Sequence, residues 1–348
     1  MQIKDITIRA YFVRMHSILS FQFMNKKDFL KEIQEDTKLI TMSSTEKWVH
    51  ENKVSIESQL DEYGAVLFSG LPVENDEDFD LFVTAFKYDT FTYEESLSNA
   101  VRINKTDKVF TANEAPSEIE IFLHHEMAQT PMYPKNIFFF CKSASQYGGE
   151  TPLCRSDYLY AELLKEDASL IAKFEKNGVI YNSIMSNGDE LVSGQGRSWQ
   201  KTLGVSSKEE AELKLKELGY TWHWLEGDNL SVTTRTLKAI KELKNGNKSF
   251  FNQVIAASLG WKKNSNNETS PVRFGNGEEI CNSNLQMISS LAESLTLLRN
   301  WKDKDILLID NHRVMHGRKP FSGEKNREVL VSLTCLLYTS PSPRDSLS

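Results

Sequence analysis

The chain has 348 residues, of which 40% are hydrophobic and 26% are charged, and its formal net charge is −7. This composition is typical of a globular protein with a substantial core, and it excludes a fibrous or wholly disordered chain. No run of Lys and Arg gives the electrostatic footprint of a nucleic-acid-binding protein, and the longest apolar runs are too short to span a membrane.

The two ends of the chain differ in character from its body. Residues 1–23 are apolar and mildly basic but lack a clean signal-peptide pattern, and Met24 opens a polar helical stretch. The last residues turn abruptly to Ser, Pro and Arg. We therefore expect a non-native or disordered extension over 1–23, one domain over 24–334 and a disordered tail over 335–348. A weak targeting segment at the N-terminus is the alternative.

Apolar patterns along the body predict alternating strands and helices. The expected strands cover residues 64–68, 137–141, 306–310 and 329–333, and the expected helices cover 76–86, 157–176 and a segment that a Ser206–Glu210 capping box opens and Gly219 ends. Gly148 and Gly149 predict a turn where the backbone approaches another group closely. The four cysteines form no C-x-x-C pair, which is typical of reduced thiols and favours a cytoplasmic location.

Two distant segments carry residues that could bind a metal. His124 and Glu126 are two residues apart, so in an extended strand they share a face while His125 points away. His316 lies far downstream, in Asp310–Arg318. Two imidazoles and one carboxylate that leave further positions open are the ligand set of a non-haem Fe(II) oxygenase.

Five residues in a fixed order extend this pattern, namely His124, Glu126, Thr151, His316 and Arg327. Their order and spacing resemble those of the TauD/TfdA-like family of Fe(II)- and 2-oxoglutarate-dependent dioxygenases, especially its clavaminate synthase and SyrP-like branch. Further matches are Met132–Cys141, Phe251–Gln253 and Leu308–Asn311 running into His316–Arg318. The resemblance covers about residues 24–333, and its motifs are specific in combination although each is weak alone.

The resemblance implies a mainly β fold with flanking helices, a double-stranded β-helix or jelly roll. It implies that His124, Glu126 and His316 hold iron, that Thr151 donates a hydrogen bond to 2-oxoglutarate, and that Arg327 pairs with the distal carboxylate of 2-oxoglutarate. With O2, such an enzyme hydroxylates an unactivated C–H bond and releases succinate and CO2. A carboxylate at position 126 argues against a halogenase, in which that ligand is absent.

Two departures from the family pattern leave choices open. Lys304-Asp305 stands where the family usually has Gly-Asp. The segment after Gly323 holds a single arginine, so Lys325 and Arg318 are alternative cations for the co-substrate. The substrate is expected to be a small polar or amino-acid-type molecule, free or tethered to a carrier protein, without nucleic acid or membrane.

Other interpretations of the same residues remain. His312 and His316 are four residues apart, a helical spacing that with Glu126 would make a zinc-like site. A zinc-dependent hydrolase that uses His124, Glu126 and a distal histidine is a second possibility. A non-catalytic jelly-roll binding protein is a third possibility. Thr151, taken alone, is a turn residue, and Asn252 is as well suited to capping a turn as to reaching a substrate.

Overall fold

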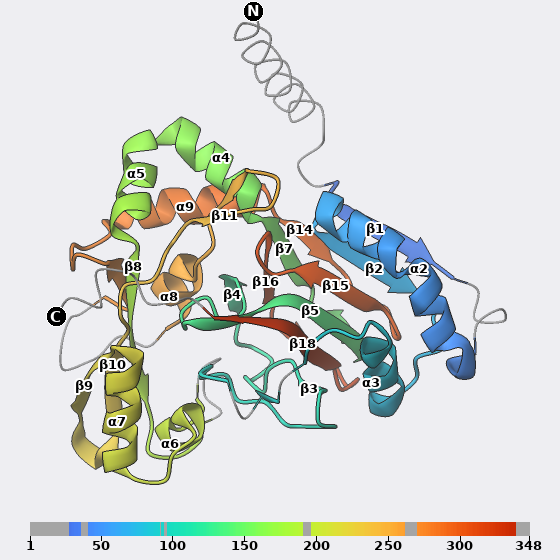
Figure 1. The fold of residues 1–348 in the computed structure, drawn as a ribbon, viewed down its shortest axis with the longest axis horizontal. Coiled ribbons are helices and arrows are strands. Elements are labelled where there is room, and N and C mark those ends of the chain that lie inside the picture. Colours follow the sequence, from blue (N-terminus) through green and yellow to red (C-terminus); the bar gives the residue numbers. More distant parts are fainter. Residues whose placement is uncertain are drawn as a thin grey trace, which may run out of the picture.

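The computed structural model of the protein describes residues 28–35, 41–90, 92–93, 96–190, 196–261 and 270–338 (Figure 1). The expected N-terminal extension, over 1–23, lies outside the described residues, as do residues 339–348 of the expected tail.

Two β-sheets face each other across the centre of the molecule. The larger has the order β1-β2-β15-β5-β18-β3 and the smaller the order β14-β7-β16-β4; every neighbouring pair is antiparallel except β1 and β2. Their bounds are β1 Leu30–Gln34, β2 Ala65–Ser69, β3 Phe110–Thr111, β4 Ile121–His124, β5 Met132–Ser143, β7 Thr151–Arg155, β14 Leu297–Arg299, β15 Ile306–Asp310, β16 Val314–Arg318 and β18 Glu328–Tyr338. Leu153 and Val314 of the smaller sheet pack with Ile137, Leu307 and Val331 of the larger in one buried cluster. The predicted double-stranded β-helix is confirmed.

Strand β5 shows how the sequence specifies these layers. Its run of apolar residues is buried on both faces, because successive side chains of a strand point to opposite sides. Ile137, Phe139 and Cys141 point into the core between the two sheets. Phe138 and Phe140 belong to a second core on the outer face of the larger sheet. That outer core is covered by α2, Met42–Tyr63, and α3, Asp76–Ala85.

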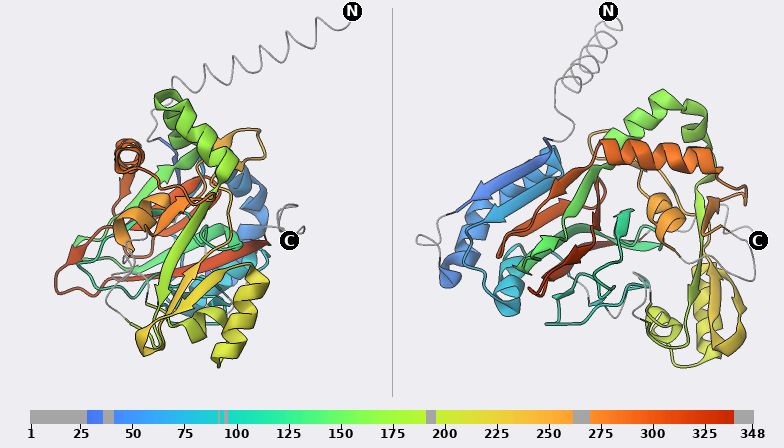
Figure 2. Two further views of the ribbon diagram at one scale, coloured as in Figure 1. Left: turned by 90° about the vertical axis from the view of Figure 1, so that its left-hand side faces the viewer. Right: turned by 180° about the vertical axis from the view of Figure 1, so that it is seen from behind.

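A second region lies at the end of the molecule opposite α2 (Figures 1 and 2). It contains a four-stranded sheet of order β13-β8-β10-β9. The bounds are β8 Val179–Met185, β9 Thr221–Trp224, β10 Leu230–Thr233, β13 Val272–Phe274, α4 Ser156–Glu166, α5 Ala168–Asn177, α6 Trp199–Leu203, α7 Lys208–Leu218, a 3-10 turn Glu226–Asp228, α8 Val254–Gly260 and α9 Asn282–Ser294. Two small hairpins pair β6, Tyr147–Gly148, with β17, Phe321–Ser322, and β11, Lys241–Glu242, with β12, Lys248–Ser249.

Most predicted elements are present, and two differ from prediction. The single helix predicted over 157–176 is two helices, because Asp167 leaves helical geometry (φ −148°, ψ 87°) and its side chain accepts a hydrogen bond from the Leu170 amide. Strand β18 also runs past the domain boundary predicted at residue 334. Strand β18 pairs with β5 as far as Tyr338, opposite Met132, so ordered chain continues four residues further.

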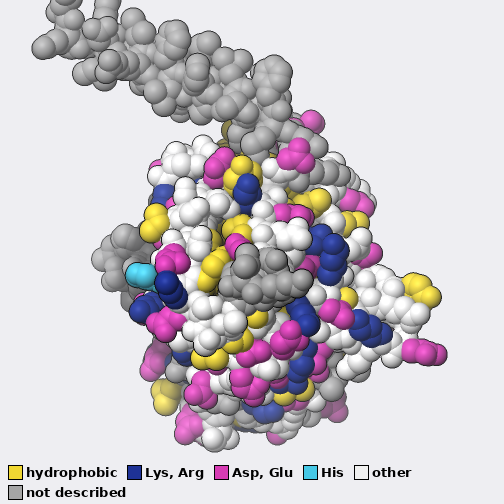
Figure 3. All heavy atoms as spheres, turned by 90° about the vertical axis from the view of Figure 1, so that its right-hand side faces the viewer, with side chains coloured by type: hydrophobic (Ala, Val, Ile, Leu, Met, Phe, Trp, Pro, Cys, Tyr) yellow, Lys and Arg dark blue, Asp and Glu magenta, His cyan; other side chains and the backbone are white. Residues whose placement is uncertain are grey.

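On the outer face over α2, the described residues form a mixed surface of basic and acidic side chains (Figure 3). Basic and acidic side chains alternate there, and several pair with each other, as Lys47 does with Glu51 and Lys87 with Glu46. Among the described residues, no helix is both long enough and apolar enough to cross a membrane.

Candidate active site

A cavity of about 520 Å³ opens between the two facing sheets. Side chains from both sheets line it, including Phe139 of β5 and His316 of β16. All five residues predicted to form the site line this cavity, namely His124, Glu126, Thr151, His316 and Arg327. Folding therefore brings together residues that are up to about two hundred positions apart in the sequence.

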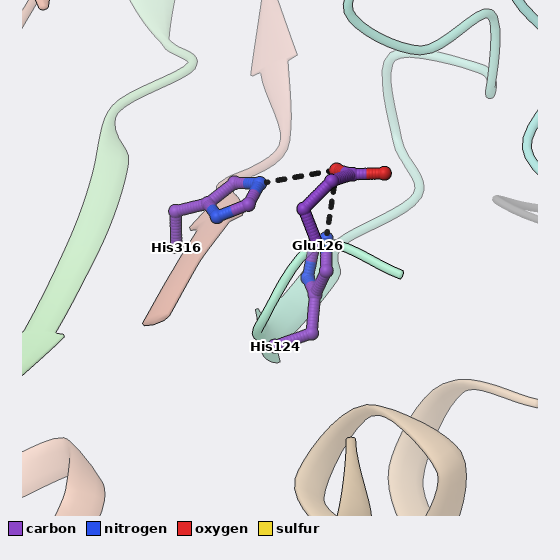
Figure 4. A group of neighbouring side chains, drawn as sticks. All are labelled: His124, Glu126 and His316. Carbon is purple, nitrogen blue, oxygen red and sulfur yellow. Dashed lines mark ion pairs between the residues drawn. The ribbon is translucent and has the colours of Figure 1, made fainter. Parts of the chain in front are cut away.

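The three predicted metal ligands converge on one point (Figure 4). His124 is the last residue of β4, and His316 lies directly opposite it on β16. One potential ligand atom from each of His124, Glu126 and His316 lies within 4.8 Å of the others. The Nε2 atoms of His124 and His316 lie 3.9 Å and 3.6 Å from the same Glu126 oxygen, Oε2. This spacing suits three ligands on one side of a metal ion.

Glu126 reaches this point from a turn and not from the predicted strand. Strand β4 ends at His124, and the chain turns through Glu126 and Met127, whose φ is 58°. The Asn311 side chain fixes this turn: its Oδ1 accepts a hydrogen bond from the Glu126 amide (2.8 Å), and its Nδ2 donates to the Glu126 carbonyl (3.0 Å) and the Pro134 carbonyl (2.8 Å). Asn311 is fully buried. The motif around Asn311 was recognised from the sequence, but its role was not.

The protonation states of His124 and Glu126 suit metal binding. Nδ1 of His124 donates to the Phe122 carbonyl (2.8 Å), which leaves Nε2 free as the ligand atom. Burial, followed by the neighbouring His316, lowers the pKa of His124 to about 4, so its imidazole is neutral at pH 7. Burial alone would raise the pKa of Glu126, but the charge of Arg102 and the two histidines outweigh it and lower this pKa.

Arg102 is a functional candidate that the sequence did not reveal. It lies on the loop before β3, and its Nη2 donates to Glu126 Oε1 and Oε2 at 3.0 Å and 2.9 Å. Only 5% of its side chain is exposed. Burial alone would lower the pKa of Arg102, but Glu126 reverses the effect and raises it, so the ion pair is stable. No motif marks this loop in the sequence.

Thr151 is the first residue of β7 and lines the cavity. Its Oγ1 accepts a hydrogen bond from the indole Nε1–H of Trp301 (2.9 Å). In this bond the Thr151 hydroxyl is the acceptor, and among the described residues it donates to no other group. Its proton is therefore available to a ligand. Trp301 thus has a role that the sequence did not suggest.

Arg327 lines the same cavity as Thr151. Its Nε and Nη2 donate to the Gly149 carbonyl at 3.3 Å and 3.2 Å, and burial, followed by the neighbouring Arg318, lowers its pKa to about 10. A Cβ at Gly149, where φ is 74°, would meet Nε of Arg327 at 2.9 Å. The close backbone approach predicted for this glycine is therefore confirmed.

The two alternative cations are engaged elsewhere. Arg318 lines the cavity but donates to three backbone carbonyls, those of Ala115, Pro116 and Ile119. Lys325 is half-exposed and pairs with Asp303 at 2.7 Å, away from the cavity lining. Arg327 is thus the cation best placed for a ligand in the cavity.

His125, His312 and Asn252 do not join the site. Residues 314–318 form a strand and not a helix, so the helical His312–His316 zinc site is wrong. His312 instead packs against Phe251, and His125 faces away from the cavity, bonded to the Asn311 carbonyl. Asn252 caps a turn by accepting from the Val254 amide at 2.9 Å.

Comparison with known proteins agrees with this geometry. Residues 33–334 match the family model described as taurine catabolism dioxygenase TauD, TfdA family. The chain is 34% identical over 279 residues to a clavaminate synthase-like protein of Arabidopsis thaliana, covering 80% of this chain and 83% of the relative. It is 27% identical over 319 residues to the dapdiamide synthesis protein DdaC of Enterobacter agglomerans, covering 87% and 92%.

A solved structure shows the same fold. It is a candidate alpha-ketoglutarate-dependent taurine dioxygenase from Burkholderia xenovorans, which superposes with a TM-score of 0.50 at 11% identity, over 91% of this chain and 94% of the other. At this identity the likeness concerns the fold alone.

Proposed function

Because the chain belongs to the TauD/TfdA family of 2-oxoglutarate-dependent dioxygenases, we propose that it hydroxylates an unactivated C–H bond of a small polar substrate, such as an amino acid. The observation that supports this proposal most is the convergence of His124, Glu126 and His316 at the wall of a cavity that also holds Thr151 and Arg327. Two imidazoles and one carboxylate fit Fe(II) and leave positions open for other ligands.

In this proposal each residue has a distinct task at the metal. His124, through Nε2, Glu126 and His316 bind Fe(II), and Arg102 keeps the Glu126 carboxylate ionised and oriented. Asn311 fixes the turn that presents Glu126. When bound, iron, 2-oxoglutarate and O2 supply the oxidising chemistry, and succinate and CO2 are the by-products.

Two residues bind 2-oxoglutarate in the same proposal. Arg327 matches the distal carboxylate with its guanidinium, which suits a planar carboxylate better than an ammonium would. Thr151 donates the proton that its bond from Trp301 leaves available. Phe139 and Phe122, which also line the cavity, limit the access of water to the bound co-substrate.

The experiment is release of succinate from 2-oxoglutarate with Fe(II) and ascorbate, with and without candidate substrates. His316→Ala should lower the release at least about a hundredfold, because losing a metal ligand costs more than the 10- to 100-fold of an outer-shell change. His223→Ala is the matched control, since His223 is exposed on β9, far from the cavity lining. Equal release by His316→Ala and the unsubstituted protein would contradict the assignment.

A further inference from the structure

Two glutamine side chains that have no task in the proposed function line the cavity. Gln129 lies three residues after Glu126, and Gln253 is the residue before α8. Nε2 of Gln253 donates to the His125 carbonyl at 2.9 Å and to Oε1 of Gln129 at 2.5 Å. The two side-chain amides, here called the glutamine pair, are therefore joined to each other and anchored to the segment that carries two of the metal ligands.

These bonds fix which atom of each side-chain amide donates and which accepts. A backbone carbonyl only accepts, so the Gln253 atom beside the His125 carbonyl is the nitrogen. Because this nitrogen also donates to Gln129, the Gln129 atom in that bond is the oxygen. The pair is left with the amino group of Gln129, which is a donor, and the carbonyl oxygen of Gln253, which is an acceptor.

Both of these remaining atoms are available to a ligand. Among the described residues, Nε2 of Gln129 donates to no group and Oε1 of Gln253 accepts from none, yet neither atom is sealed in the interior. Gln129 also borders a second pocket, but at about 20 Å³ this pocket has room for little more than one water molecule. A larger ligand group therefore meets the glutamine pair from the main cavity.

The glutamine pair and Thr151 lie on opposite sides of a metal ligand. In the smaller sheet, His316 of β16 pairs with Leu153 of β7 on one side and with His124 of β4 on the other. Thr151 begins β7, whereas Gln253 bonds to the residue that follows β4. The glutamine pair is thus separated from the residues proposed to bind 2-oxoglutarate, and its position suits a group that binds the substrate.

We propose that the glutamine pair binds a primary carboxamide group of the substrate, whose oxygen accepts from Gln129 Nε2 and whose N–H donates to Gln253 Oε1. This inference rests on the proposed function and narrows its substrate class to molecules that carry such an amide. A primary amide presents an acceptor and a donor along one edge, which complements the pair. A carboxylate would place an oxygen against Gln253 Oε1, and an ammonium would leave the Gln129 donor unpaired, so both are disfavoured.

The test compares the binding of acetamide with that of acetone, which has a similar shape and the same carbonyl oxygen but no N–H. The full chain is loaded, without O2, with Mn(II) in place of iron and with saturating 2-oxoglutarate. Relaxation of the methyl protons of each probe by Mn(II) then reports its binding near the metal. Acetamide should bind about five- to tenfold more tightly, because acetone leaves the Gln253 oxygen without a donor.

Two variants should give different results. Gln253→Met removes the acceptor and should bring the affinities for acetamide and acetone to within about twofold of each other. Gln129→Met removes the donor to the carbonyl oxygen of either probe, so both affinities should fall about fivefold. Gln146→Met is the matched control, since Gln146 is exposed just before β6, outside the cavity lining, and should change neither affinity.

Three results would overturn the carboxamide site. These are equal affinities for the two probes in the unsubstituted protein, a preference for acetamide that survives Gln253→Met, or unchanged affinities in Gln129→Met. Gln253→Met also removes a donor to the His125 carbonyl, so if this variant does not fold, the affinities of Gln129→Met decide.

Calorimetry of Mn(II) and 2-oxoglutarate on the same samples separates this proposal from the proposed function. If the unsubstituted protein binds neither, the proposed function fails. If it binds both without preferring acetamide to acetone, only the carboxamide site fails.

Discussion

The two halves of the cavity are built differently. The metal half, formed by His124, Glu126, His316 and the supporting Asn311, is tightly hydrogen-bonded, and the Asn311 amide uses its acceptor once and its donor group twice. The co-substrate half, formed by Thr151 and Arg327, has weaker ties. Arg327 bonds one carbonyl at 3.2–3.3 Å, close to the limit for a hydrogen bond.

Because of this difference, substitutions in the two halves should have different effects on stability and on ligand affinity. The hydrogen bonds of Asn311 to the Glu126 turn are made within the protein, so changes there should affect stability and metal affinity together. Groups in the co-substrate half keep donors for a ligand, so changes there should affect ligand affinity with little effect on stability. Substitutions in each half can therefore confirm or break the distinction.

The largest effect is expected from Asn311→Ala. The change removes the hydrogen bonds that Asn311 makes to the Glu126 amide and to the Glu126 and Pro134 carbonyls in the interior of the protein. The free energy of unfolding should fall by about 3–5 kcal/mol, since each unsatisfied buried group costs about 1–3 kcal/mol. Urea unfolding of the metal-free protein measures this change. Asn282→Ala, at the exposed start of α9, is the control and should change stability by less than about 0.5 kcal/mol.

Arg327→Gln should weaken the binding of 2-oxoglutarate strongly and lower the stability of the protein only slightly. The dissociation constant for 2-oxoglutarate should rise about 10- to 100-fold, because a hydrogen bond to a charged group is worth about 1.5–3 kcal/mol. Stability should change by less than about 1 kcal/mol, because the guanidinium bonds a single carbonyl of the protein. Calorimetry and urea unfolding give the two values. A larger effect on affinity from Lys325→Gln would show that Lys325, and not Arg327, binds the co-substrate.

His312, which packs against Phe251, should make the free energy of unfolding depend on pH. Burial, followed by the charge of Lys241, lowers the pKa of His312 to about 2, against about 6.5 in an unfolded chain. Between these values the unfolded state binds a proton that the folded state does not. The contribution of neutral His312 to the free energy of unfolding is therefore complete above about pH 6.5. It is lost as the pH falls, at up to about 1.4 kcal/mol per pH unit. His312→Phe should reduce the slope of unfolding free energy between pH 6 and pH 5 by about that amount. An unchanged slope would mean that water reaches His312.

A smaller effect is expected from Trp301→Phe in the co-substrate half. Without the indole N–H, the Thr151 hydroxyl is no longer held with its proton free for the ligand. The KM for 2-oxoglutarate should rise about fivefold, corresponding to the 0.5–1.5 kcal/mol of a typical hydrogen bond, with kcat nearly unchanged. In a double-mutant cycle with Thr151→Val the two effects should not add. Additive effects would show that Trp301 acts independently of Thr151.

The order of motifs along the sequence and the family resemblance that it carries were sufficient to predict the facing sheets and the five residues that line the cavity, whereas apolar patterns predicted only individual strands and helices. The sequence could not assign roles to Arg102 and Trp301, whose loops meet the site only after folding and carry no periodic pattern. It also missed the break at Asp167, where a local side-chain cap outweighs a continuous helical pattern. Residues such as Arg102 and Trp301 support the site through contacts that form only in the folded protein, and spacing in the sequence does not reveal these contacts.

The smallest effect concerns a departure from the family pattern that lies outside both halves. Lys304, which replaces the usual glycine, has φ of 72°, a left-handed conformation that costs a non-glycine residue about 1 kcal/mol or more. Lys304→Gly should raise the free energy of unfolding by about 0.5 kcal/mol, because glycine's greater freedom in the unfolded chain offsets part of the relief. The exposed pair with Glu74 contributes little. Lys304→Ala, which loses that pair without relieving the backbone, is the control and should not stabilise. Metal and 2-oxoglutarate affinities should stay unchanged in both variants, since the turn touches neither half of the cavity.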